Sequence, residues 1–372
     1  MIPITRLFVG EEEAMAAAEA VRSGWITQGK RGERFEAMVA EYVGARYAIA
    51  TNSCTTALHL ALIAAGVQPG DEVICPSFSF IATANAICYA GATPVFVDID
   101  PRTYNIDPML VEAAVTQRTT AIMPVSQIGL AADIPAIMEV ARRHGLKVVE
   151  DAAPSLGSII GESRIGSLSD FTCFSFDARK ILTTGEGGMI TTNDEKTAER
   201  LRSLRAHAAS VSTMARHKSD RAVFEEYPEL GYNYKLTDIQ AAIGIVQIGK
   251  IEQIIAERRK LAQRYKILLS GDDRIEAPSE PPGCRHVYQS YCIHIQSTLP
   301  QSMIMAKLAS RGISSRRIMA IHLEPLYRKR FAGLSLPMTE RAAAETILLP
   351  MYVGLTEAEQ DEIVEVLLKS LD

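Results

Sequence analysis

Short apolar runs rich in β-branched residues alternate with longer amphipathic stretches through the first half of the chain. Such runs, bounded by turn residues, are typical of buried strands, whereas apolar residues three and four apart are typical of helices. The pattern predicts seven strands, at residues 47–51, 72–75, 93–97, 120–124, 146–150, 171–175 and 188–192. Helices are expected between the first five strands, at residues 54–65, 80–90, 108–115 and 134–144. This alternation predicts an α/β fold with a mostly parallel sheet covered on both faces.

The pattern changes in the second half of the chain. A long helical run extends from residue 236 to about residue 269, a loop with Pro and Gly follows at 270–285, and strand character returns at 287–296. We therefore expect a large domain over residues 1–250, including the N-terminal segment, and a smaller C-terminal α+β domain over residues 251–372. Thr356 and Glu359 form a capping box, which predicts a surface helix over residues 355–371.

Composition narrows the class of protein. The chain has 372 residues, of which 47% are hydrophobic, and this is enough for a substantial core. A net charge of −5 provides no overall basic field for nucleic acid, and no apolar run approaches the roughly 18 residues that cross a bilayer, so we expect neither a nucleic-acid nor a membrane partner. The six cysteines form no CxxC pair, which favours reduced thiols and a cytoplasmic location. No His/Cys/Asp cluster has metal-ligand spacing, so we expect no metal.

Lys180 is the strongest candidate for chemistry. A lone lysine near glycines is usually a solvated surface residue. Here the apolar run 146–150 ends immediately before Asp151, and a glycine-bearing stretch at 183–188 follows the lysine. A lysine able to form a Schiff base, together with a carboxylate able to hold a pyridinium nitrogen, is the minimum chemistry of pyridoxal 5′-phosphate (PLP).

Two further segments are compatible with that cofactor. Ser53, Cys54 and Thr55 follow a predicted strand and open a predicted helix, where backbone N–H groups can bind phosphate, although a plain helix cap explains them equally well. Phe80 lies at a strand-to-helix junction and could stack on a planar ring, although by itself it would more often belong to the core.

Ordered motifs through nearly the whole chain resemble the DegT/DnrJ/EryC1/StrS family of fold-type I, PLP-dependent aminotransferases, most of which aminate keto groups on nucleotide-linked sugars. The motifs are Gly24-Trp25-Ile26-Thr27-Gln28-Gly29, Pro76-Ser77-Phe78-Ser79-Phe80, Val97-Asp98-Ile99-Asp100, Glu150-Asp151-Ala152-Ala153, Phe174-Ser175-Phe176, Lys180, Thr184-Gly185-Glu186-Gly187-Gly188, Gly231-Tyr232-Asn233-Tyr234-Lys235 and Leu348-Leu349-Pro350.

The resemblance implies a role for each matched residue. Lys180 corresponds to the Schiff-base lysine and general base, and Asp151 corresponds to the partner of the pyridinium nitrogen. Asn233 corresponds to a residue that reaches the phosphate bound in the neighbouring subunit, which implies a homodimer with shared sites. The residues that match the phosphate-binding and ring-stacking positions are Ser53, Cys54, Thr55, Ser175 and Phe80.

Three positions depart from the family pattern. Pro154 stands where the family usually has the Gln that hydrogen-bonds the ring hydroxyl of the cofactor, so another group or water must replace it. Cys54 lies in a turn that usually contains glycine. Gln127 lies near the place of a common histidine. These departures indicate an uncommon subgroup or substrate.

Other polar and aromatic residues are candidates for substrate binding. His286 and His322 lie in segments that resemble substrate-facing loops, and Arg316 with Arg317 could meet a diphosphate, although paired arginines are more often solvated. The full set of expected substrate residues is Trp25, Gln127, Tyr232, His286, Arg316 and His322.

We therefore expect an aminotransferase that moves an amino group from glutamate or glutamine to a keto-sugar by a ping-pong cycle of PLP and pyridoxamine 5′-phosphate (PMP). A cyclitol, a carbocyclic keto acid or a sugar without a nucleotide stays open as the acceptor. A PLP-binding regulator without turnover is disfavoured because Lys180 and Asp151 are both present. A PMP-dependent sugar dehydratase is also disfavoured, because that subgroup has histidine in place of the lysine.

Overall fold

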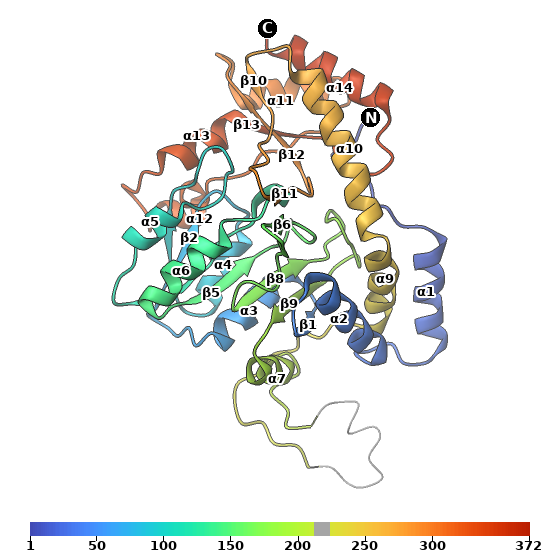
Figure 1. Ribbon diagram of the computed structural model, residues 1–372, viewed down its shortest axis with the longest axis vertical. Helices are drawn as coiled ribbons and strands as arrows, with labels where there is room; N and C mark the ends of the chain where they lie inside the picture. The colour runs from blue at the N-terminus through green and yellow to red at the C-terminus, as the bar shows by residue number, and fades with distance from the viewer. Residues whose placement is uncertain (212–223) are drawn as a thin grey trace.

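The computed structural model of the protein describes residues 1–211 and 224–372. A seven-stranded sheet with the order β1-β9-β8-β5-β4-β2-β3 forms its centre (Figure 1). The strands are parallel except β9, which runs antiparallel to both of its neighbours. All seven predicted strands are confirmed to within a few residues: β1 (Tyr47–Thr51), β2 (Glu72–Pro76), β3 (Thr93–Val97), β4 (Thr119–Ile122), β5 (Lys147–Asp151), β8 (Phe171–Ser175) and β9 (Gly188–Thr192).

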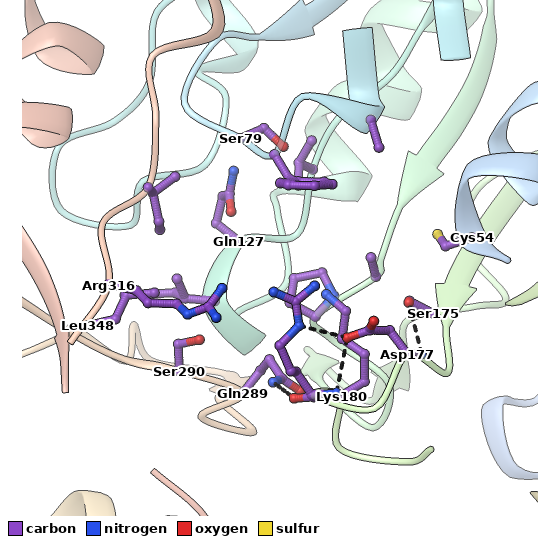
Figure 2. A pocket seen from close by; sticks show the side chains of 18 of the residues that line it. Cys54, Ser79, Gln127, Ser175, Asp177, Lys180, Gln289, Ser290, Arg316 and Leu348 are labelled. Atoms are coloured by element: carbon purple, nitrogen blue, oxygen red, sulfur yellow. Dashed lines mark hydrogen bonds and ion pairs between the residues drawn. The ribbon is translucent and has the colours of Figure 1, made fainter. Parts of the chain in front are cut away.

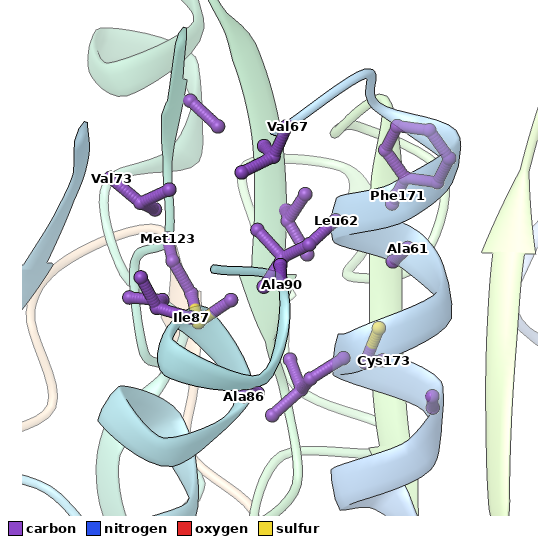
Figure 3. Packing of buried hydrophobic residues seen from close by; sticks show 14 of the residues in the cluster. Ala61, Leu62, Val67, Val73, Ala86, Ile87, Ala90, Met123, Phe171 and Cys173 are labelled. Atoms are coloured by element: carbon purple, nitrogen blue, oxygen red, sulfur yellow. The ribbon is translucent and has the colours of Figure 1, made fainter. Parts of the chain in front are cut away.

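Helices cover both faces of this sheet, and strand β2 shows why its sequence is a continuous apolar run. Val73 and Cys75 pack on one face, and Ile74 packs on the other, so no position on the strand faces water. Figure 3 shows the first of these faces, where residues of α3 and α4 meet the sheet. The helices of the large region are α1 (Glu11–Arg22), α2 (Lys30–Val43), α3 (Cys54–Ala64), α4 (Ala82–Tyr89), α5 (Pro108–Ala113), α6 (Ile134–His144) and α7 (Glu195–Leu204).

A smaller antiparallel sheet, with the order β10-β12-β13, forms the centre of the C-terminal region. The predicted strand at 287–296 is confirmed only for residues 291–295, and the predicted loop at 270–285 contains β10 and β11. The predicted C-terminal helix is confirmed with its Thr356–Glu359 capping box. The elements are β10 (Ile275–Glu276), β11 (Cys284–Arg285), β12 (Tyr291–Ile295), α11 (Gln301–Ser310), α12 (Pro325–Arg328), α13 (Pro337–Glu345), β13 (Thr346–Leu349) and α14 (Glu357–Ser370). Strands β6 (Ile159–Ile160) and β7 (Ser163–Arg164) pair with β11 in a third sheet.

The long helical run is two helices rather than one, α9 (Asp238–Gly249) and α10 (Ile251–Leu269), bent by 59°. Gly249 weakens the helix at the bend. The ammonium of Lys250 there is bound by Glu12 and Glu13 of α1, each at 2.7 Å. Within the described residues no single helix is long and apolar enough to cross a membrane, although this bent pair passes that test on length and composition together.

The N-terminal segment lies against the smaller sheet. Ile2 pairs with Ile313 and belongs to the same hydrophobic cluster as the residues of β12 and β13. The amide of Met351 donates to the carbonyl of Ile4 at 3.1 Å. Figure 1 accordingly shows both chain termini at the same end of the molecule. The division at residue 250 stays a prediction, but the first residues contact the region on the far side of it.

Candidate active site

A cavity of about 420 Å³ opens where β5 and β8 end. The small C-terminal sheet and residues Ile4 and Thr5 close its other side. Ligands of α/β proteins bind in this position, beyond the carboxyl ends of parallel strands. The cavity brings together most of the site residues expected from the sequence, namely Ser53, Cys54, Thr55, Phe80, Gln127, Asp151, Ser175, Lys180 and Arg316 (Figure 2).

Asp151 ends strand β5 and is held by two donors. Its Oδ2 accepts a hydrogen bond from the Thr83 hydroxyl at 2.8 Å, and its Oδ1 accepts one from the Ala153 amide at 3.2 Å. Burial raises the pKa of this carboxyl, while the Thr83 and Ala153 hydrogen bonds and the nearby Lys180 oppose the rise. The Thr83 hydroxyl also lies 2.9 Å from that of Ser79, which lines the cavity, so the carboxylate is anchored to the cavity wall.

Lys180 follows β8 in a turn closed by its own amide, which donates to the carbonyl of Asp177 at 2.9 Å. Burial lowers the pKa of its ammonium, and the negative charges of Asp151 and Asp177 oppose that change. A lowered pKa increases the fraction of free amine, which is the form that attacks a carbonyl or accepts a proton.

The N-terminus of α3 forms one end of the cavity. Ser53 is its N-cap, and its Oγ accepts from the Thr56 amide at 3.2 Å, so the capping interpretation is confirmed. The Cys54 and Thr55 amides precede the first intrahelical hydrogen bonds and remain free to bind an anion. Gly188 packs closely here, since a Cβ at this position would lie 2.4 Å from the Ser53 carbonyl oxygen.

Cys54 and Ser175 flank this end of the cavity (Figure 2). Cys54 is buried with its Sγ 3.7 Å from the carbonyl of Cys173, and burial raises the pKa of the thiol well above its ordinary value. The Ser175 hydroxyl accepts from the Asp177 amide at 3.3 Å. Phe80, by contrast, is 62% exposed although it lines the cavity, so its ring does not belong to the core and is available for stacking.

The opposite wall, which we call the small-domain wall, consists of Gln289, Ser290, Arg316 and Arg317. Gln289 and Ser290 were not expected from the sequence, because they lie in a loop before β12 without a recognisable motif. Gln289 donates to the carbonyl of Arg179 at 2.5 Å, and its Oε1 is buried without a partner among the described residues. Arg317 lies 3.7 Å from Glu324.

The two expected histidines lie outside this cavity. The His286 ring is fully buried, stacks on Tyr288 at 4.0 Å, and accepts from the Tyr288 amide at 2.8 Å. Burial lowers the pKa of His286 to about 3. His322 is buried as well, with its Nδ1 2.7 Å from the Ser77 hydroxyl and its Nε2 3.4 Å from Glu340. Neither ring lines the cavity, so their substrate roles stay predictions that the single chain does not favour.

Three more expected residues lie away from the cavity of their own chain. Trp25 donates to the carbonyl of Gln28 at 3.1 Å, and Tyr232 packs against His59 at 4.9 Å. Asn233 is exposed and pairs with Ala206 in an antiparallel bridge. These positions leave the three side chains without access to the cavity from within one chain. Among the described residues no group of three or more His, Cys, Asp or Glu side chains is placed to hold a metal ion.

Residues 8–368 match the DegT/DnrJ/EryC1/StrS aminotransferase family. The protein belongs to this family. It is 41% identical over 354 residues to GDP-perosamine synthase of Caulobacter vibrioides, covering 94% of this chain and 92% of that protein. It is 38% identical over 371 residues to a spore coat polysaccharide biosynthesis protein of Bacillus subtilis, covering 98% and 95%. The chain is therefore an aminotransferase of a family of sugar aminotransferases.

Solved structures agree with this assignment. The aminotransferase TlmJ from Streptoalloteichus hindustanus superposes with a TM-score of 0.92 at 34% identity, covering 100% of this chain and 99% of that chain. The PLP form of a putative sugar aminotransferase from Streptococcus pneumoniae gives a TM-score of 0.92 at 28% identity, with both chains fully covered, and its PMP form is also similar. The similarity to these structures confirms the expected fold. The family is PLP-dependent, which confirms the expected cofactor.

The cavity fits PLP. It places a lysine, a buried carboxylate and free helix N-terminal amides around one space. The close approach of Gly188 to Ser53 keeps the backbone at that end compact, as a phosphate site requires. The exposed ring of Phe80 adds a flat apolar surface.

Proposed function

We propose that the protein transfers an amino group from glutamate or glutamine to the keto group of a nucleotide-linked sugar. The observation that carries the proposal is the presence of Lys180 and Asp151 in one cavity, in a chain that shares 41% identity with GDP-perosamine synthase. The relative supports a nucleotide-linked acceptor, and the cations of the small-domain wall fit a diphosphate. We also keep the cytoplasmic location as a prediction.

In this proposal each part of the cavity has one task. Lys180 would hold PLP covalently, and its amine would move a proton from the donor Cα. The buried Asp151, held by Thr83, keeps its charge directed at the pyridine nitrogen. The amides at the start of α3, with Ser53, Thr55 and Ser175, bind the phosphate, and Phe80 stacks on the ring. PLP supplies an electron sink that stabilises negative charge at the Cα carbon.

The amino group is moved in two half-reactions. In the first, with the cofactor bound, the donor would give up its amino group and leave as a keto acid. In the second, the amino group passes to the carbonyl carbon of the sugar and the carbonyl oxygen leaves as water. A ping-pong order follows, because the donor product leaves before the sugar reacts.

The decisive experiment is a spectral screen of the PMP form against keto-sugars with and without a nucleotide. Return of the long-wavelength cofactor absorbance with a nucleotide-linked keto-sugar, and not with the matching free sugar, is the expected result. Return only with free sugars, cyclitols or carbocyclic keto acids would contradict the nucleotide assignment. No return with any carbonyl compound, in protein that binds PMP, would contradict the aminotransferase reaction on sugars.

We further propose a homodimer with shared sites, in which Asn233 reaches the phosphate bound in the other subunit. Its exposed position outside its own cavity supports this arrangement. In a heterodimer of Lys180→Ala and Asn233→Ala subunits, one site carries both changes and the other carries neither. Random subunit exchange should therefore restore up to about a quarter of the wild-type sites.

The mixing experiment requires that Asn233→Ala alone be clearly impaired. Activity is measured before and after verified exchange of the two variants. If exchange restores no activity, Asn233 does not act across the subunit interface. Lys180→Ala mixed with itself is the matched control, and it should stay inactive.

A further inference from the structure

The residues proposed to hold the cofactor leave its ring hydroxyl without a hydrogen-bond partner. PLP carries a ring hydroxyl next to the carbon that bonds to lysine, and its phosphate arm is on the other side of that carbon. Lys180, Asp151 and the N-terminus of α3 account for the reacting carbon, the ring nitrogen and the phosphate. Pro154 lines the cavity after Ala153 but has no polar side-chain atom. A hydroxyl that is removed from water on binding needs a hydrogen-bond partner.

Strand pairing places Gln127 beside this part of the chain. Val125 pairs with Asp151 in a parallel bridge, and the Ser126 amide donates to the Asp151 carbonyl at 3.0 Å. Two residues further along the two segments are Gln127 and Ala153, and both line the cavity. The register therefore brings the Gln127 side chain to the same wall as Asp151 and Pro154.

The orientation of the Gln127 amide is determined by its surroundings. Its backbone N–H donates to the Oδ1 of Asn105 at 2.8 Å, and its Nε2 donates to the carbonyl of Phe78. Because that carbonyl only accepts, the NH₂ group must face it, and the Oε1 faces the other way. Gln127 is only 5% exposed, so little room remains for other rotamers.

Gln127 also lies on the side of the cavity opposite the proposed phosphate end. Figure 2 shows it across from Cys54 and Ser175, which flank the proposed phosphate end, and Gln127 lines the cavity. The hydroxyl and the phosphate arm of PLP lie on opposite sides of the ring. With the phosphate at α3, the hydroxyl therefore faces the wall that carries Gln127.

We propose that Gln127 is a cofactor-binding residue whose Oε1 accepts a hydrogen bond from the ring hydroxyl of PLP and PMP, the contact that Pro154 cannot make. The inference rests on the proposed roles of Lys180, Asp151 and α3 in holding the cofactor. Gln127, which the sequence analysis expected to bind the substrate, is therefore assigned to the cofactor.

Binding of PMP and of its 3-deoxy analogue, measured by calorimetry, tests the proposal without turnover. Wild-type protein should prefer PMP by about fivefold, the equivalent of one neutral hydrogen bond. Gln127→Met, which keeps the volume and removes the amide, should bind both ligands equally. Ser290→Ala, on the small-domain wall of the same cavity, is the matched control and should keep the preference. A Gln127→Met protein that still prefers PMP would overturn the proposal.

A spectroscopic measurement covers the case in which Gln127→Met does not fold. The pH at which the two absorption bands of the PLP-loaded protein interconvert reports loss of the proton that the Schiff-base nitrogen shares with the ring oxygen. A carboxylate is a stronger acceptor than an amide, so Gln127→Glu should move that midpoint to higher pH. An unchanged midpoint in Gln127→Glu would contradict the contact.

Two other outcomes separate this inference from the proposed function. If Gln127→Met leaves PMP binding unchanged and raises only the KM for the keto-sugar, Gln127 contacts the substrate and the inference fails alone. If wild-type protein binds neither PLP nor PMP, the proposed function and the inference both fail.

Discussion

The two walls of the cavity are built differently. On the sheet wall, Asp151 is buried and held by Thr83 and Ala153, and the strand-end segment after β8 positions Lys180. On the small-domain wall, Arg316 and Arg317 are exposed, and they come from loops rather than from strands of the large sheet. The groups proposed for the chemistry lie at a strand end or in the turn that follows one, whereas loops of the C-terminal region present the groups expected to select the substrate. Changes on the sheet wall should therefore affect rate, and changes on the small-domain wall should affect substrate affinity.

The largest effect is expected for Lys180→Ala, because it removes both the covalent attachment and the base. Activity should fall by about 10³-fold or more while PMP still binds. Borohydride reduction of wild-type protein loaded with PLP should fix the phosphopyridoxyl group on the peptide that contains Lys180. Finding the label on Lys147 or Lys235 instead would refute the assignment.

The next effect is expected for Asp151→Asn, which keeps the shape of the side chain and removes its charge. The rate of the half-reaction with the amino donor should fall by about 100-fold, the scale for losing charge stabilisation in a transition state. Rapid-scanning absorbance of the PLP form measures it. Thr83→Val, which removes one donor to the same carboxylate, should give a smaller loss that Thr83→Ser restores. A normal rate in Asp151→Asn would mean that another group holds the ring nitrogen.

Glu150 precedes Asp151 on β5, and its substitution should change stability rather than rate. It is fully buried, and burial raises its pKa from 4.5 to about 7, against the hydrogen bonds from Ser126, Thr172 and Ser169. The folded state therefore binds this proton more tightly than the unfolded state, so the contribution of Glu150 to stability is fully present below pH 4.5 and is lost as the pH rises through about 7.

Glu150→Gln should abolish that pH dependence. Relative to wild type, the variant should gain about 3 kcal/mol of unfolding free energy between pH 5 and pH 8, the equivalent of the raised pKa. Urea denaturation at the two pH values measures the change. Glu72→Gln is a contrasting control, since the pKa of Glu72 is lowered by Thr116 and, in addition, by Arg118. A parallel pH dependence in wild type and Glu150→Gln would contradict the raised pKa.

The smallest effect is expected on the small-domain wall. Arg316→Ala should raise the KM for the nucleotide-linked sugar by about tenfold or more, with little change in kcat. The reason is that the complex with the variant lacks the hydrogen bond between the guanidinium and the diphosphate. Arg317→Ala is the matched control with a smaller effect, since its guanidinium already faces Glu324 at 3.7 Å. A large fall in kcat for Arg316→Ala, with KM unchanged, would remove the distinction between the two walls.

The sequence by itself determined the large sheet and the position at its edge of the residues proposed for the chemistry. Apolar runs such as Val73-Ile74-Cys75 have no polar position, so a strand formed by them must be buried on both faces. Asp151 ends such a strand, and the Ser53 cap and Lys180 come two and five residues after the ends of two others, so local chain order brings each of them to the carboxyl edge. The family resemblance assigned their chemistry, and the match over residues 8–368 confirms the family.

Only the tertiary structure decided which distant segments complete the site. The bend at Lys250 depends on contacts with α1, the pairing of Ile2 with Ile313 joins the two ends of the chain, and Gln289 enters the cavity from a loop without a motif. It also decided that Phe80 is exposed to the cavity and that the His286 ring is buried. Periodicity reports which face of an element is apolar, whereas these placements depend on contacts between residues far apart in the chain, which no local pattern records.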